Sequence, residues 1–157
     1  KSWWVLRGAP VDPLVVLRAK SAFGLVPMLI VGEVVVVGSG ILLDARTPVL
    51  VGEAVLTALL AWGISGIAAA LGAIWPDFTS ENAARAASSP AAVFFMVIAQ
   101  VLVFVVLAFF VLAAYFAFKG HYVGAIGLAL CPVALCLFAG HWPPRRAAAI
   151  LWARGLQ

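Results

Sequence analysis

The chain alternates long apolar stretches with short polar connections. Two of the apolar stretches contain no charged residue, and the other two hold one glutamate each, Glu33 and Glu53. Because about 20 apolar residues in a helix cross the ~30 Å hydrocarbon core of a bilayer, each stretch predicts a transmembrane helix. The expected fold is an all-α integral membrane protein with four transmembrane helices, short loops and an N-terminal cytoplasmic coupling or interfacial helix. The four stretches cover residues 22–43, 48–75, 91–118 and 122–142.

Composition indicates a bilayer rather than water as the solvent. Hydrophobic residues make up 66% of the 157 and charged residues 10%, whereas about 25% of the residues in a soluble domain are charged. A small soluble fold could not hide so much apolar surface. The pI of about 9.6 does not indicate a nucleic-acid partner, because the cations lie beside apolar stretches and form no soluble basic patch.

The basic residues predict an orientation. Four spans place only Arg46 and Lys119 on one side of the membrane. Since cytoplasmic loops are rich in Lys and Arg, we expect a multi-pass membrane protein with both termini cytoplasmic. The residues on the cytoplasmic side are Lys1, Arg7, Arg18, Lys20, Arg85, Arg145, Arg146 and Arg154.

Three segments are expected to be cytoplasmic: a coupling segment at 1–21, a loop at 76–90 and a tail at 143–157. The Pro143–Pro144 pair is expected to end the fourth helix, because proline removes a backbone donor and clashes with the preceding turn. The chain does not start with Met, and we interpret it as a fragment of a longer protein.

Two polar segments carry helix-start signals. Asp12 is a good N-cap and Pro13 suits the first helical position, so a helix is predicted from Pro13 into the first span. In the 76–90 loop, Glu81 is favourably placed at the start of a short helix. Local physics leaves two interpretations open for each segment. The N-terminal segment is either an interfacial anchor or a contact for a partner. The 76–90 segment is either a linker or a further contact.

Both segments also resemble a known family. Leu6, Pro10, Val11 and Lys20 match a Leu-rich stretch, a Pro-Val pair and a helical Lys in one cytoplasmic segment. A second pattern is matched by Gly72, Ala73, Pro76, Asp77, Phe78, Glu81, Asn82, Ala84 and Ser89. Asp12 stands where Ser is common, and Pro90–Ala91 replaces glycines. The chain thus resembles the permease (transmembrane) subunit of bacterial ABC-2-type transporters, in an exporter branch.

The resemblance implies a membrane-spanning permease part of an ATP-driven exporter, which transmits ATPase motion through its cytoplasmic segments to the helices. The resemblance also implies a location in the bacterial cell (inner) membrane. The implied partners are an ABC ATP-binding subunit, the lipid bilayer and a second permease copy or half. The alternative is a small structural or regulatory multi-pass membrane protein without transport activity. The implied contacts to the ATPase are Leu6, Pro10, Val11, Asp12, Leu14, Lys20, Asp77, Phe78, Glu81, Asn82 and Arg85.

No phosphate-binding loop of the form Gly-x-x-x-x-Gly-Lys-Ser/Thr occurs in the 157 residues. We therefore expect ATP to bind a separate subunit, and this chain to hold no cofactor and to be no enzyme. Glu33 and Gln100 form a candidate intramembrane polar site. Glu33 either lines a substrate path or hydrogen-bonds a neighbouring helix, and Gln100 favours a helix-to-helix contact.

The remaining residue patterns favour packing over chemistry. Cys131 and Cys136 are expected to be two buried thiols that point in different directions. His121 and His141 lie at opposite ends of the fourth span, so they cannot share a metal ion. The small residues of the second span and the Gly120–Gly124 pair are expected to let helices approach closely.

Overall fold

The computed structural model of the protein describes residues 12–75 and 89–155 of the chain. These residues form four helices and, within those two ranges, no strand. The prediction of an all-α fold with four helices is confirmed, and each helix is long and apolar enough to cross a membrane. The helices are α2 (Pro13–Leu42), α3 (Thr47–Ile74), α5 (Pro90–Phe118) and α6 (Tyr122–Gly155).

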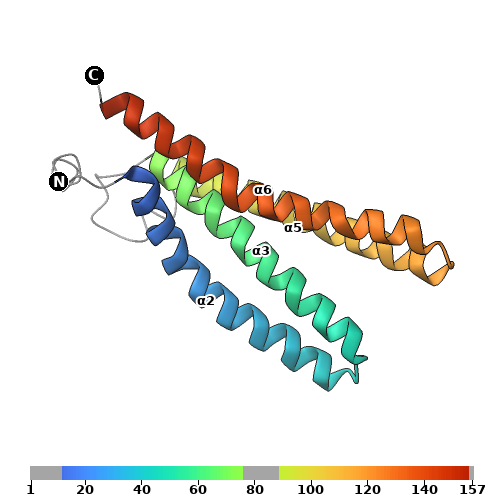
Figure 1. The fold of residues 1–157 in the computed structure, drawn as a ribbon. Helices are drawn as coiled ribbons and strands as arrows, with labels where there is room; N and C mark the ends of the chain where they lie inside the picture. Colours follow the sequence, from blue (N-terminus) through green and yellow to red (C-terminus); the bar gives the residue numbers. More distant parts are fainter. Residues whose placement is uncertain (1–11, 76–88, 156–157) are drawn as a thin grey trace.

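The four helices make two antiparallel hairpins, α2 with α3 and α5 with α6 (Figure 1). The hairpins come together where α2 begins and α3 and α6 end, and they spread apart toward their connecting turns (Figure 1). We call the first end the convergent end. The first turn, between Leu42 and Thr47, and the second, between Phe118 and Tyr122, therefore lie at the opposite, divergent end of the molecule.

Both hairpin turns use the same C-terminal cap. At the end of α5, the His121 amide bonds the Phe116 carbonyl at 3.0 Å and the Gly120 amide bonds the Ala117 carbonyl at 3.0 Å. This is the Schellman pattern, which requires a left-handed residue, and Gly120 supplies it with φ +82°. At the end of α2, Asp44 takes that position with φ 51°, since aspartate tolerates this conformation better than most residues.

The first helix begins where the sequence predicts. Asp12 caps it, because its carboxylate oxygen accepts a 2.8 Å hydrogen bond from the Leu14 amide, and Pro13 follows in the first turn. Residues 13–20 are the first turns of α2 itself, and the helix continues through Pro27 to Leu42. The described part of the predicted coupling segment, residues 12–21, is therefore continuous with the membrane-length helix α2 and does not form a separate helix.

At the centre of the fold, α3 and α6 run side by side in the same direction and cross closely (Figure 1). A Cβ built on Gly66 would stand 2.6 Å from the Gly140 Cα, and one built on Gly63 would stand 3.3 Å from the Cys136 carbonyl oxygen. Only glycine allows two backbones to come so near. The expectation that small residues of the second span serve packing is thereby confirmed.

Helices α2 and α5 flank this central pair, α2 mainly on α3 and α5 mainly on α6. On α5, Leu102, Val106 and Ala113 are buried, and the rest of the helix carries many exposed large apolar side chains. Buried side chains form two clusters. One lies at the convergent end and joins Leu17, Ala70, Ala73, Ala147 and Ala148; the other lies farther along and joins Ile67, Leu102, Val106, Cys136 and Ala139.

The predicted end of the fourth helix is wrong. Helix α6 does not stop at Trp142 but continues through Pro143 and Pro144 to Gly155. Each proline removes one backbone donor, yet the residues that follow pack into the fold, since Ala147 is fully buried and Ala148 is 9% exposed. Burial of this turn against α2 and α3 outweighs two missing hydrogen bonds, so the 143–157 segment is helical at least to Gly155.

The Gly120–Gly124 pair behaves differently from the expectation of close helix packing. Gly120 lies in the turn, and a Cβ built on it would meet no atom within 4 Å. Gly124 alone faces a neighbour, because its built Cβ would stand 3.4 Å from a ring carbon of Phe116. Within the described residues, Gly120 thus serves the turn of the second hairpin and Gly124 packs against α5, whereas a contact of the pair with a second copy of the chain stays a prediction.

Candidate functional site

Polar and aromatic side chains gather on α6 as it approaches the convergent end. His141, Trp142, Arg145 and Arg146 follow one another there, and Trp62 of α3 lies beside them. All of these except Arg146 line an open groove of about 380 Å³, together with Leu137 and Phe138. Cationic, aromatic and imidazole groups lie together in this part of the described structure, and we call it the α6 site.

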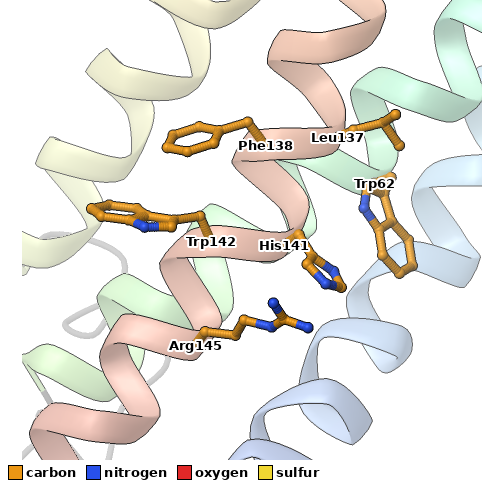
Figure 2. Close-up of a pocket in the computed structure, with 6 residues that line it drawn as sticks. All are labelled: Trp62, Leu137, Phe138, His141, Trp142 and Arg145. Carbon is orange, nitrogen blue, oxygen red and sulfur yellow. The ribbon is translucent and has the colours of Figure 1, made fainter.

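Figure 2 shows how these side chains divide over two faces of α6. The His141 ring lies between the Trp62 ring and the Arg145 guanidinium, on the side that faces α2. On the other side, Phe138 and Trp142 stack with their ring centroids 5.3 Å apart. The Arg146 guanidinium carbon lies 5.0 Å from the centre of the Trp142 ring, close enough for a cation–π attraction.

A second groove runs along the other side of α6, between α3 and α5. Its volume is about 480 Å³. Both helices pack on α6 but make few contacts with each other, and this leaves a trough whose floor is α6. Apolar side chains line it from Leu135 to Pro143, and Arg146 is the one charged lining residue among those that the structure describes. We call it the α3–α5–α6 groove.

Further cations lie at the same end of the molecule. Lys20 of α2 is exposed, and its ammonium nitrogen would stand 3.6 Å from a Cβ built on Gly72 of α3. Arg46 lies in the connection between α2 and α3, at the divergent end. At a helical rise of 1.5 Å per residue, Gly72 lies about 39 Å from Arg46 along α3. This length is close to the ~40–45 Å of a bilayer that includes its headgroup regions. The two groups of cations therefore lie about one membrane thickness apart.

Of the residues expected to contact an ATPase, the structure describes Asp12, Leu14 and Lys20. Asp12 caps α2, Leu14 packs on the cluster at the convergent end, and Lys20 is exposed beside α3. Whether these residues contact a partner stays a prediction. The others lie outside the described residues: Leu6, Pro10, Val11, Asp77, Phe78, Glu81, Asn82 and Arg85.

The structure does not bring the two predicted intramembrane polar residues into contact with other polar groups. Glu33 is half-buried on α2 and Gln100 is exposed on α5. Neither side chain forms a hydrogen bond or ion pair with another residue in the described ranges. Gln100 thus makes no helix-to-helix hydrogen bond within this part of the chain, and a functional role for Glu33 stays a prediction.

The thiols and imidazoles are placed largely as expected. Cys136 is buried, while Cys131 is exposed, contrary to the expectation of two buried thiols. Within residues 12–75 and 89–155, no three His, Cys, Asp or Glu side chains lie together as metal ligands. His141 was considered only as a metal ligand, so sequence reasoning missed the α6 site. The signal that could have revealed it is the run His141-Trp142-x-x-Arg145-Arg146, read as one helix.

In the described residues, the fold and the site define an all-helical protein with four helices long and apolar enough to span a membrane and with more cations at the convergent end than at the divergent end. The chain belongs to a family described as "Putative ATP-binding cassette", whose model matches residues 1–135. No curated protein and no solved structure matches the chain. The family membership supports the coarser expectation that the chain is part of an ABC transporter system.

The same finding corrects the identification made from the two short motifs. An ATP-binding cassette is the nucleotide-binding component of such a transporter, so the identification as an ABC-2-type permease subunit is wrong. The function inferred from it, a membrane-spanning permease part of an exporter, is overturned by the same match. The four apolar helices do not by themselves decide which component of the system the chain supplies.

Proposed function

We propose that the four helices form a membrane-embedded anchor of an ABC transporter system, which holds the system's nucleotide-binding component at the bacterial cell membrane. The observation that carries this proposal is the combination of membership in the ATP-binding cassette family with four apolar helices of 28 to 34 residues. Such helices suit the hydrocarbon core of a bilayer, and the family supplies the system to which the anchor belongs.

The distribution of apolar side chains supports membrane embedding. The outer faces of α2 and α5 expose residues such as Phe23, Val34, Phe104 and Val111, each more than half accessible. In water this surface would be costly, whereas lipid tails solvate it at no such cost. At the crossing of α3 with α6 and at the convergent end, the inner contacts rely instead on glycine and alanine. This is typical of helix association in membranes, where close van der Waals packing replaces the hydrophobic effect.

The cations support an orientation for this anchor. At the convergent end lie Arg18, Lys20, Arg145 and Arg146, whereas the divergent end carries Arg46 and Lys119. By the positive-inside rule, the convergent end faces the cytoplasm, where a nucleotide-binding component would meet it. The first turns of α2, from Asp12 to Lys20, offer this component a capped helix that is continuous with the membrane anchor.

ATP binding and hydrolysis belong, in this proposal, to a separate subunit. Support comes from the sequence, in which no Gly-x-x-x-x-Gly-Lys-Ser/Thr loop occurs. That loop places backbone amides and a lysine around the phosphates, and the apolar helices described here offer no comparable cradle. The anchor therefore acts by position, since it keeps the nucleotide-binding subunit at the bilayer surface.

The test is cross-linking from two matched cysteines in native membranes. Val15→Cys lies at the convergent end of α2, and Val35→Cys lies about 30 Å farther along the same helix; both native side chains are exposed, at 55% and 61%. The exposed Cys131 is first replaced by serine. After cross-linking and purification, mass spectrometry identifies any captured peptide that belongs to a protein with a phosphate-binding loop.

We expect the cysteine at position 15 to capture such a protein and the cysteine at position 35 to capture none. Resistance of the chain to alkaline extraction would confirm membrane embedding. Release of the chain by alkaline buffer would refute the proposal. A chain that stays in the membrane but captures no nucleotide-binding protein from either position would instead support a structural or regulatory membrane protein outside any ABC system.

A further inference from the structure

The α3–α5–α6 groove has the form of a binding site for a single chain-like apolar ligand. Leu135 and Arg146, at its two ends on α6, are separated by about 16 Å of helical rise. One leaflet of a bilayer contributes about 15 Å of the ~30 Å hydrocarbon core. The length of the groove therefore matches the depth of one leaflet, which an acyl chain fills. The volume of the groove, about 480 Å³, falls within the usual ~300–1,000 Å³ of ligand sites.

The groove is apolar along its length and opens to the outside of the bundle. Val101 and Ile98 of α5 line one wall and are 56% and 39% exposed, and Phe138 of α6 is 54% exposed. Ile67, Ala70 and Leu71 line the wall formed by α3. In the proposed membrane placement this opening faces lipid, so the surrounding bilayer can fill it without any movement of the helices.

The end of the groove that lies nearest the convergent end carries a charged side chain, unlike the rest of the lining. Arg146 is there, with its guanidinium held over the Trp142 ring. Among the residues that the structure describes, no carboxylate forms an ion pair with it. A guanidinium presents several donors in a plane and suits a phosphate group, and tryptophan is typical of the membrane interface. A long apolar groove that ends at a cation matches one class of ligand, a molecule with an apolar chain and an anionic head.

We propose that the α3–α5–α6 groove binds an anionic phospholipid of the cytoplasmic leaflet, with one acyl chain between α3 and α5 and its phosphate at Arg146. Basic pockets between membrane helices on the cytoplasmic side are known to select anionic headgroups. The proposal rests on the membrane placement argued above but not on the nucleotide-binding partner. The lipid would fill the gap that α3 and α5 leave over α6 and so brace the two hairpins against each other.

The experiment uses the full chain, reconstituted in bilayers of phosphatidylcholine and phosphatidylglycerol, extracted in mild detergent and analysed by native mass spectrometry. Two pairs of variants isolate the two halves of the site. Arg146→Gln removes the cation of the groove, and Arg145→Gln removes its neighbour, which lines the α6 site instead. Val101→Trp fills the groove, and Val97→Trp adds the same bulk one turn away, at an exposed position outside the lining.

We expect phosphatidylglycerol to remain bound to the wild-type chain in preference to phosphatidylcholine. Arg146→Gln should lower its occupancy about fivefold, the factor that corresponds to ~1 kcal/mol for one basic residue near an anionic surface, and Arg145→Gln should lower it much less. Val101→Trp should reduce the occupancy by both lipids, whereas Val97→Trp should leave it unchanged.

Equal losses from the two arginine variants would show that only general charge attracts the lipid, and would overturn the proposal. Equal effects of the two tryptophan variants would show that no chain lies in the groove, with the same consequence. Displacement of the lipid by inorganic phosphate would also contradict it. A wild-type chain that resists alkaline extraction but shows no headgroup preference refutes the lipid site alone, whereas a chain released by alkaline buffer refutes the membrane anchor itself.

Discussion

The close crossing of α3 and α6 can be tested with a single methyl group. In the substitution Gly66→Ala, the new Cβ would stand 2.6 Å from the Gly140 Cα and 2.7 Å from the Gly140 carbonyl oxygen. These neighbours are backbone atoms, so no side-chain rotation can relieve the contact. The two helices must move apart, and this movement would disturb the buried cluster that contains Ile67, Cys136 and Ala139.

The expected magnitude follows from two opposing effects. Overpacking a well-packed contact costs about 1–3 kcal/mol, while replacing a helical glycine by alanine gains up to about 1 kcal/mol in helix propensity. Gly127→Ala on α6 serves as the matched control, because a Cβ there meets no atom within 4 Å. It should show the propensity gain alone, so the free energies of unfolding of the two variants should differ by about 1–3 kcal/mol.

The assay is reversible unfolding of the purified chain in mixed micelles of a mild detergent and dodecyl sulfate, followed by far-UV circular dichroism. Gly66→Ala should unfold at a lower dodecyl sulfate fraction than the wild type, and Gly127→Ala at an equal or higher one. Equal stability of the two alanine variants would mean that the backbones of α3 and α6 do not touch at Gly66, and it would refute the close crossing of these two helices.

Two further changes probe the ends and the interruptions of the helices. Asp12→Ala should destabilise the start of α2 by about 1 kcal/mol, because the Leu14 amide loses its acceptor; amide hydrogen exchange at that turn should quicken about fivefold, and Asp12→Asn should preserve the protection. Pro143→Ala restores a backbone donor inside α6 and should stabilise the chain by up to about 3 kcal/mol, measured by the same unfolding assay. Pro48→Ala is its control, since Pro48 lies in the first turn of α3, where the missing donor costs nothing; an equal gain in both variants would contradict the interior position of Pro143.

The existence and the approximate bounds of the helices were predictable because run length and local capping decide them. Four uncharged or nearly uncharged runs exceed the length of a bilayer core, and the Asp12–Pro13 pair marks the start of α2 as the structure has it. The end of α6 was not predictable by the same local rule. Proline chemistry stops a helix in isolation, but the burial of Ala147 and Ala148 is a tertiary effect that no local rule contains.

The sites were harder to predict than the helices, for a physical reason. When a helix is apolar on all sides, hydrophobic periodicity does not indicate which face meets a neighbour. The sequence of α5 is apolar nearly all round, so the groove beside Val101 could not be derived from it. The short motifs that resembled a permease were likewise local signals, and the match over residues 1–135 outweighs them.

The crossing of α3 with α6 also imposes an order of assembly. The two helices are separated in the chain by all of α5, so in the proposed membrane placement their contact forms only after both hairpins have entered the membrane. Helices that are stable individually in lipid insert first and associate afterwards. We therefore expect α2 with α3 and α5 with α6 to insert as two independent units, each closed by its own turn. The docking of these units at Gly66 and Gly140 would then be the last step of folding and the first to be lost in unfolding.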